Sequence, residues 1–446
     1  MFGFIKRLTG SEPASPINDD PFGRDARTLV PGVTSSAAPS RETPPVVLQR
    51  DEIIDARTRI GGYRFSARLP GSPDQPHAHA TIEVLRASNI AAFAERRLAL
   101  IPLLAGHWLS FDYRPLIGPR TVFVLELPAD AGQIKGWRDV AAAVRIAGAR
   151  IALPGRDIPR DRELIREHAD LLLLDFSAYS LPNFERAVTT LRREQPQLEL
   201  VADNVGSWPE HRYCVSLGVA YCLGPFTTCH DEEQRSGEIS QSRLVLIEML
   251  NLLRRDADLT DIANVAKRDP GVAVKLVAMA NSPLLGLTHP VAAIDQAIML
   301  LGREQLYRWL SIGMFRAGAG SPRDEVLLEL ALARGRFLEL VGGGRHGKAE
   351  SDELFLLGLL SLLDSLLGVP MARVVERLHL SPAIQGVLLR SEGPFGPYLM
   401  LAIAVEKGRA ENVGRLAGQL AIPLEEVEAA SMQALAWAED AVRLSQ

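Results

Sequence analysis

The chain changes character near its middle, and this change constrains the fold more than any other sequence feature. Before about residue 230, short β-rich runs alternate with stretches of helix length, whereas from about Asp231 onward the strand pattern disappears and helical spacing continues. Repeated alternation of strand and helix predicts a largely parallel sheet, either open or closed into a barrel. The sequence therefore predicts an α/β domain followed by an all-α domain.

The strand candidates of the first half share short runs of β-branched, aromatic or leucine residues. They are residues 62–68, 107–111, 121–127, 150–153, 171–176, 198–202 and 219–223. The apolar run 171–174 is typical of a strand that is buried on both faces. The predicted helices between the strands are residues 133–147, 160–169, 182–194 and 208–217.

The second half carries apolar residues at helical spacing, together with strong helix formers. The predicted helices are residues 243–254, 259–267, 272–280, 294–301, 303–315, 324–341, 352–367 and 424–444. The first 45 residues differ from both halves because they are rich in Pro, Ser, Gly, Asp and Thr and lack a sustained apolar period. Such a segment buries too little apolar surface to offset its ordering entropy. We therefore predict a disordered leader (1–45), an α/β domain (46–230) and a helical domain with a C-terminal helical extension (231–446).

Charge and cysteine content exclude several classes of function. The chain has 49 Lys and Arg residues against 54 Asp and Glu residues, a net charge of −5, which gives no support to nucleic-acid or anionic-membrane binding through bulk charge. Its three cysteines form no CxxC pair, so neither a disulfide framework nor a zinc knuckle is indicated, and we expect a reducing, cytoplasmic setting. No apolar run approaches the roughly 20 residues of a membrane-spanning helix. The apolar and basic opening peptide (1–8) is interpreted as a frayed terminus. The alternatives are a short peptide that binds the membrane surface and a peptide that docks onto a partner.

Short motifs occur in order at the predicted strand ends of the first half. They are Arg64–Arg68, Trp108–Phe111, Leu125–Ala129, Ala152–Gly155, Leu173–Asp175, Ala202–Gly206 and Leu223–Gly224. Their order and spacing resemble those of EAL-domain cyclic di-GMP phosphodiesterases, in the degenerate form found in EAL-HDOD two-domain proteins. The resemblance implies a modified TIM barrel with its reactive groups at the carboxyl ends of the strands.

The resemblance also implies that the chemistry of this family is lost. Cleavage of a phosphodiester there needs carboxylates that hold divalent metal ions, an activated water and a Lys near the reacting centre. Where the family has metal ligands or this Lys, the chain has Arg64, Ser110, Ala129, Leu173 and Gly206, and no carboxylate within 152–155. Acidic side chains remain at matched functional positions only at Asp175 and Asp203. We therefore expect no catalytic residues, no metal and no cofactor.

The retained acids have two interpretations. The favoured one is that Asp175 and Asp203 cap the helices that follow their strands. The alternative is that they belong to a nucleotide site that binds without hydrolysis, in which Arg68 is the matched residue able to hold a phosphate. An enzyme with an unrelated centre would require Asp175, Asp203 and Glu126 to converge in one pocket.

The start of the helical half carries the most specific motif of the chain. Asp269-Pro270 and Ala280-Asn281-Ser282 stand at a separation that resembles HDOD domains, which are relatives of HD phosphohydrolases. Ser361 and Leu362 stand where the His-Asp metal dyad of those enzymes is expected, and nearby Asp364 lacks a nitrogen partner. Asn281 is interpreted as a turn residue, with a binding role as the alternative. His230-Asp231 is interpreted as a solvated dipeptide of the junction.

These observations predict a non-catalytic bacterial signal-transduction protein, a pseudoenzyme that acts as a regulator or scaffold through protein–protein contacts. The resemblance links it to cyclic di-GMP-associated behaviour. The alternative is a receptor that binds cyclic di-GMP or another nucleotide without hydrolysing it. The expected partners are unidentified signalling proteins, no nucleic acid is expected, and a homo-oligomer stays open.

Overall fold

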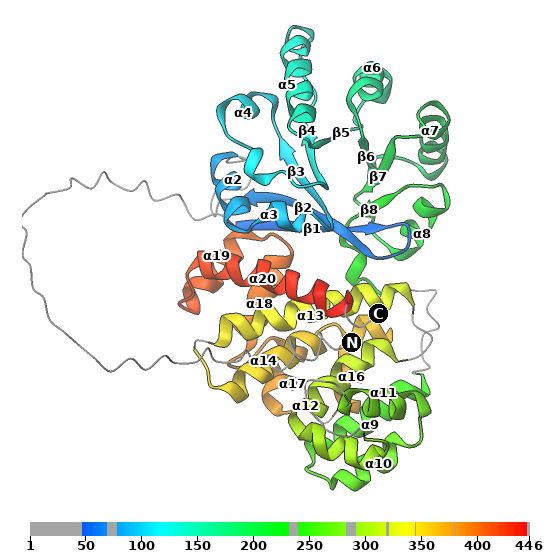
Figure 1. The fold of residues 1–446 in the computed structure, drawn as a ribbon, viewed down its shortest axis with the longest axis vertical. Helices are drawn as coiled ribbons and strands as arrows, with labels where there is room; N and C mark the ends of the chain where they lie inside the picture. Colours follow the sequence, from blue (N-terminus) through cyan, green and yellow to red (C-terminus); the bar gives the residue numbers. More distant parts are fainter. Residues whose placement is uncertain are drawn as a thin grey trace, which may run out of the picture.

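The computed structural model describes residues 47–68, 78–231, 240–281, 291–317, 321–343, 345–378 and 380–443. The predicted leader, residues 1–45, lies outside the described residues. Within them the chain forms a barrel followed by a helical half, which confirms the predicted fold class (Figure 1).

The first half is a closed barrel of eight strands in sequence order, β1 to β8. The strand β1 runs antiparallel to both of its neighbours, and the pairs from β2–β3 to β7–β8 are parallel. The strands are β1 (Val47–Asp55), β2 (Ile60–Arg68), β3 (Leu98–Leu103), β4 (Thr121–Leu125), β5 (Arg150–Pro154), β6 (Leu171–Asp175), β7 (Glu199–Asp203) and β8 (Tyr221–Leu223).

The helices of the barrel half follow the strands. They are α2 (Ala78–Ala87), α3 (Ile90–Phe93), α4 (Ala105–Ser110), α5 (Ile134–Ile146), α6 (Ile158–His168), α7 (Leu181–Glu194) and α8 (Trp208–Ser216), with short 3-10 turns η1 (Arg114–Leu116), η2 (Ala131–Gln133), η3 (Phe176–Ala178) and η4 (Pro225–Thr228). Alternate strand residues fill the barrel interior with a separate apolar cluster that includes Leu100, Val122, Leu171 and Val201.

Two parts of the strand prediction were wrong. Residues 107–111 lie mostly in helix α4, and the strand is instead the buried run Leu98–Leu103. An aromatic residue that suggested a strand packs the short helix onto the barrel: the Trp108 ring meets Phe123 of β4 at a centroid distance of 5.7 Å. Strand β1 was missed because its charged residues Arg50 and Glu52 obscure the apolar pattern of a buried strand.

The second half is helical throughout its described residues, as predicted. Its helices are α9 (Gln241–Arg254), α10 (Leu259–Ala266), α11 (Pro270–Ala280), α12 (Ile294–Arg316), α13 (Pro322–Gly343), α14 (Lys348–Leu360), α15 (Leu363–Leu367), α16 (Met371–Arg377), α17 (Pro382–Arg390), α18 (Gly396–Glu406), α19 (Ala410–Gln419) and α20 (Leu424–Arg443). Helix α12 is interrupted at Gly302, where φ is +69°, so the two helices predicted on either side of this glycine are confirmed. Helices α16 to α19 were not predicted.

The landmarks of the helical half have structural roles. Asp269 caps α11 by accepting a hydrogen bond from the backbone N–H of Val272 at 3.0 Å. The Asn281 amide exchanges two hydrogen bonds with the backbone of Val291, at 2.7 and 2.6 Å, which confirms the turn interpretation. Ser282 lies outside the described residues. The interpretation of Asp231 as solvated was wrong: its side chain is buried and forms an ion pair with Arg212 at 2.8 Å.

The two halves pack through β1 and the segment before β3 (Figure 1). Helices α18, α19 and α20 contact β1. The backbone N–H of Leu48 donates to the Glu428 carboxylate of α20 at 3.1 Å, and Arg97 forms a two-bond ion pair with Glu329 of α13, at 2.6 and 3.1 Å. One hydrophobic cluster extends through both halves. The helical half therefore packs against β1 and approaches the amino ends of β2, β3 and β4.

Across the described residues, no single helix combines the length and apolar character needed to cross a bilayer. By length and composition alone one bent pair qualifies, Ala349–Leu367 with Met371–Arg377, at an angle of 113°.

Candidate functional site at the barrel mouth

The carboxyl ends of the parallel strands form a mouth to which several strands contribute charged side chains. Asp175 and Asp203 are the last residues of β6 and β7, and the side chain of Arg64, from the middle of β2, reaches Asp203. The register pairs Asp175 directly with Asp203, and it pairs Arg64 with Asp51 of the antiparallel strand β1. Barrel closure thus gathers residues that lie far apart in the sequence.

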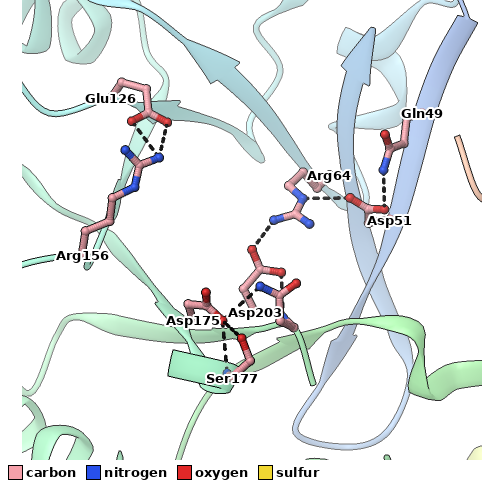
Figure 2. A network of polar contacts seen from close by, with 9 residues as sticks. Gln49, Asp51, Arg64, Glu126, Arg156, Asp175, Ser177 and Asp203 are labelled. Atoms are coloured by element: carbon pink, nitrogen blue, oxygen red, sulfur yellow. Dashed lines mark hydrogen bonds and ion pairs between the residues drawn. The ribbon is translucent and has the colours of Figure 1, made fainter. Parts of the chain in front are cut away.

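Arg64 is the centre of this cluster (Figure 2). Its Nε donates to the carboxylate of Asp51 at 2.9 Å, and a terminal guanidinium nitrogen forms an ion pair with Asp203. Burial alone would lower the pKa of Arg64, but the carboxylates of Asp203 and Asp51 outweigh this effect, and the pKa is raised. The guanidinium therefore provides a permanent positive charge between two carboxylates.

Asp175 is held by neutral donors. Its Oδ1 accepts hydrogen bonds from the Ser177 hydroxyl at 2.7 Å, the Ser177 backbone N–H at 3.1 Å and the Asn204 amide at 3.0 Å. The hydrogen bonds from Ser177 and Asn204 lower the pKa of Asp175. Asp175 is the N-cap of η3, so the capping interpretation is confirmed for this residue.

The capping interpretation was wrong for Asp203. Ser207 caps helix α8 instead, because Asp203 ends its strand too early to reach the helix. Asp203 accepts a hydrogen bond from the backbone N–H of Asn204 at 2.9 Å and otherwise pairs with Arg64. Asp203, which stands at a position matched to the family's site, is thus paired with Arg64 of the same chain.

Glu126 lies apart from these acids, on the other side of the mouth, where it forms an ion pair with Arg156 at 3.3 Å (Figure 2). The convergence of Glu126, Asp175 and Asp203 that an unrelated catalytic centre would require is not observed. Among the described residues, no three His, Cys, Asp or Glu side chains are grouped so that they could hold a metal ion. With Arg64 between Asp51 and Asp203, the side chains at the mouth do not fit the divalent metal ions that the fold family implies.

Two predicted site residues need separate comment. Arg68 ends β2 opposite Val47, and its side chain lies outside what the structure describes. Ser110 does not occupy a strand end: it lies on α4, and its hydroxyl donates to the carbonyl of Gly106 at 3.0 Å. In β3, Leu98 and Leu100 belong to the cluster that fills the barrel interior. If this alternation continues, Pro102 is the last position of β3 on the interior face, and it therefore takes the place that Ser110 was expected to hold.

Asp51 and Arg156 were missed by the sequence reasoning. A signal for Asp51 was present, because it stands two residues from Ile53, whose side chain fills the barrel interior. Arg156 directly follows the Pro154-Gly155 turn of β5 and carries no motif of its own.

The position of the HD dyad in the helical half is also close to an arginine. Arg334 of α13 donates to the Ser361 hydroxyl at 2.7 Å and forms a two-bond ion pair with Glu406, at 2.8 and 2.6 Å. The Arg334 side chain is only 7% exposed. Both regions matched to metal centres thus hold a guanidinium bound to carboxylate.

Comparison with known proteins agrees with the two-part fold. The HDOD domain model matches residues 242–372, within the helical half. Cyclic di-GMP phosphodiesterase CdgJ of Vibrio cholerae is 22% identical over 331 residues, which cover 74% of this chain and 76% of that protein. The uncharacterized protein YuxH of Bacillus subtilis is 24% identical over 286 residues, or 63% of this chain and 68% of that protein. The similarity to CdgJ is too long to lie within either half alone, and the predicted EAL-HDOD architecture is confirmed.

Solved structures with a likeness to the chain include two cyclic di-GMP complexes. The calcium and cyclic di-GMP complex of BlrP1 from Klebsiella pneumoniae has a TM-score of 0.32 and 20% identity, covering 41% of this chain and 54% of that one. This chain therefore spans about half the length of BlrP1. The EAL domain of FimX from Pseudomonas aeruginosa, bound to cyclic di-GMP, has a TM-score of 0.35 and 14% identity, covering 42% of this chain and 90% of that one.

Proposed function

Because the chain has the EAL-HDOD two-domain architecture, we propose that it is a non-catalytic signalling protein of cyclic di-GMP-associated pathways. In this proposal the barrel does not hydrolyse cyclic di-GMP, and the protein acts in the bacterial cytoplasm as a regulator or scaffold through contacts with other signalling proteins. The observation that carries the proposal is the guanidinium of Arg64, which binds Asp51 and Asp203 at the barrel mouth.

The charges at the barrel mouth oppose the binding of a divalent cation. A divalent cation at the mouth would need carboxylate oxygens that are free to coordinate it. Here the Arg64 guanidinium binds two of the carboxylates and cancels one of their two negative charges, and it would also repel a metal ion entering beside it. The third, Asp175, has its Oδ1 occupied by three hydrogen bonds. Within the described part of the chain, this arrangement supports the proposal that the mouth does not hold the metal ions on which this family's reaction depends.

The assay is incubation of the purified full-length chain with cyclic di-GMP and Mg²⁺ or Mn²⁺, followed by chromatography of the nucleotides. The expected result is no linear dinucleotide, and Mn²⁺ titration by calorimetry should show no saturable heat. Asp203→Asn is the matched control, because it removes one carboxylate charge from the mouth and keeps the side chain's size. Metal-dependent hydrolysis by the wild-type chain that disappears in Asp203→Asn would refute the proposal.

The alternative of a nucleotide receptor is tested by the same preparation. Calorimetric titration with cyclic di-GMP in the absence of metal separates a receptor from a scaffold, and comparison with Arg68→Ala shows whether Arg68 contributes. Saturable binding without hydrolysis would favour the receptor.

Exposed apolar side chains on the helical half support action through protein contacts. Val274 on α11 and Met299 and Leu300 on α12 are 68%, 60% and 43% exposed, and these two helices pack against each other. Exposed apolar residues on neighbouring helices are a feature of interaction sites. Cross-linking of the wild-type chain and a Val274→Ser/Met299→Ser variant in cells should show fewer cross-linked partners for the variant.

A further inference from the structure

We propose that the cleft between the barrel and the helical half binds a small anion rich in phosphate. The cleft has a volume of about 510 Å³. Its barrel wall is formed at the amino ends of β2, β3 and β4, and its other wall by α13 and α20. It therefore lies at the opposite end of the barrel from the mouth.

Arginine is the most frequent residue type in the lining of this cleft. Five arginines line it, namely Arg59, Arg96, Arg97, Arg120 and Arg443. The barrel supplies the first four, and α20 supplies the last. A cleft that presents guanidinium groups from both halves is suited to an anion that contacts both halves.

Some of these arginines have partners within the protein. Arg97 binds Glu329, Arg96 binds Asp440 at 2.8 Å, and both also approach Glu439, at 3.4 and 3.7 Å respectively. The side chains of Glu329 and Glu439 are only 7% and 9% exposed, so these pairs form the floor of the cleft.

Two arginines are free to bind a ligand. Arg59 and Arg120 are exposed, and among the described residues neither forms a side-chain hydrogen bond or an ion pair. The Oδ1 atom of nearby Asp55 accepts hydrogen bonds from the backbone N–H groups of Arg57 and Arg59, both at 2.9 Å. Five acids also line the cleft, and of these Glu95 is exposed and Glu325 is half-buried, so these two oppose an anion most directly.

The chemistry of the lining defines the class of ligand. A guanidinium group offers a planar fork of donors that matches phosphate oxygens, which makes arginine well suited to bind phosphate. The lining contains no aromatic residue, so it offers no ring on which a base could stack. The volume is in the range of small-molecule sites, which are frequent at domain interfaces. The geometry therefore favours a compact phosphate or diphosphate group over recognition of a nucleobase.

Binding at this cleft would couple the two halves. Arg443 on α20 pairs with Asp440 at 3.2 Å, and its side chain is exposed at this pair. A ligand that contacts Arg59 or Arg120 on the barrel and also Arg443 stabilises the packed arrangement, because it binds only when both walls are in place. This inference does not depend on the mouth of the barrel, and it holds whether or not the chain hydrolyses cyclic di-GMP.

The test uses inorganic pyrophosphate with the full-length chain, without added metal. We expect saturable heat in calorimetry and an increase in the thermal unfolding temperature. In Arg59→Ala and Arg120→Ala the dissociation constant should rise about tenfold or more for each residue, as expected for the loss of a hydrogen-bonded charge pair. Arg166→Ala, which removes an exposed arginine on α6, should bind pyrophosphate like the wild type.

Because Arg59 and Arg120 are exposed, their variants should unfold at the wild-type temperature when pyrophosphate is absent. Arg120→Gln, which keeps a polar side chain and removes the charge, provides a second variant for the same comparison. The proposal is overturned if pyrophosphate does not bind, or if it binds the Arg59 and Arg120 variants as tightly as the wild type. Hydrolysis of cyclic di-GMP would refute the non-catalytic function and leave this measurement unaffected.

Discussion

Glu428 provides the sharpest test of how the two halves are joined. It lies on α20 with its side chain buried, its Oε1 accepts the backbone N–H of Leu48 in β1, and its Oε2 has no hydrogen-bond partner. Burial raises the pKa of Glu428 from 4.5 to about 7, although the Leu48 N–H and the charge of Arg50 act in the opposite direction. The perturbation we consider is Glu428→Gln, which keeps an oxygen for Leu48 and removes the ionisable group.

The direction in which stability changes with pH follows from the number of protons bound by the native and the unfolded chain. Between the ordinary and the raised pKa, the native carboxyl keeps a proton that the unfolded chain has lost, so the free energy of unfolding falls as pH rises through this window. A shift from 4.5 to about 7 corresponds to about 3 kcal/mol at 1.36 kcal/mol per unit. Glu428→Gln should therefore be more stable than the wild type by about 3 kcal/mol near pH 8, and by less than about 1 kcal/mol near pH 5.

The assay is urea unfolding of both proteins at the two pH values, followed by circular dichroism. Glu425→Gln is the control, since Glu425 is exposed on the same helix and should gain no stability at the higher pH. The reasoning fails if Glu428→Gln is no more stable than the wild type near pH 8, or if its advantage is the same at both pH values.

Three further predictions concern burial and packing. Arg97→Ala should lower the free energy of unfolding by about 3 kcal/mol in urea titration, because it leaves Glu329 buried without its cation. Gly358→Ala should lower thermal stability by an amount equivalent to about 1–3 kcal/mol, because the new Cβ would lie 2.6 Å from the backbone of α13. Gly418→Ala, whose new Cβ would meet nothing within 4 Å, should raise stability by up to about 1 kcal/mol. Burial lowers the pKa of His211 from 6.5 to about 4. The free energy of unfolding of the wild type should therefore fall by about 3 kcal/mol as pH falls through this window, and that of His211→Leu should fall by less. Equal acid sensitivity of the two proteins would contradict this prediction.

Much of the fold could be predicted because it depends on local pattern. The alternation of strands and helices, the buried run of β6 and the helix boundary at Gly302 all follow from neighbouring residues. Strand β1 and the true position of β3 could not be predicted in this way. The charged residues Arg50 and Glu52 of β1 line a small cavity together with residues of α13, α18 and α20, and the aromatic residue Trp108 after β3 packs on Tyr113 and on Phe123 of the barrel.

The candidate site, like the fold, could be predicted from the sequence only in part. The sequence by itself determined that a cation stands at the first ligand position and that two acids remain at later strand ends, because these are properties of individual residues. Only the tertiary structure decided that Arg64 binds Asp203, 139 positions away, and Asp51, and that Asp175 caps a short turn. Such pairings depend on barrel closure, which brings strand ends together through backbone hydrogen bonds that no local pattern encodes.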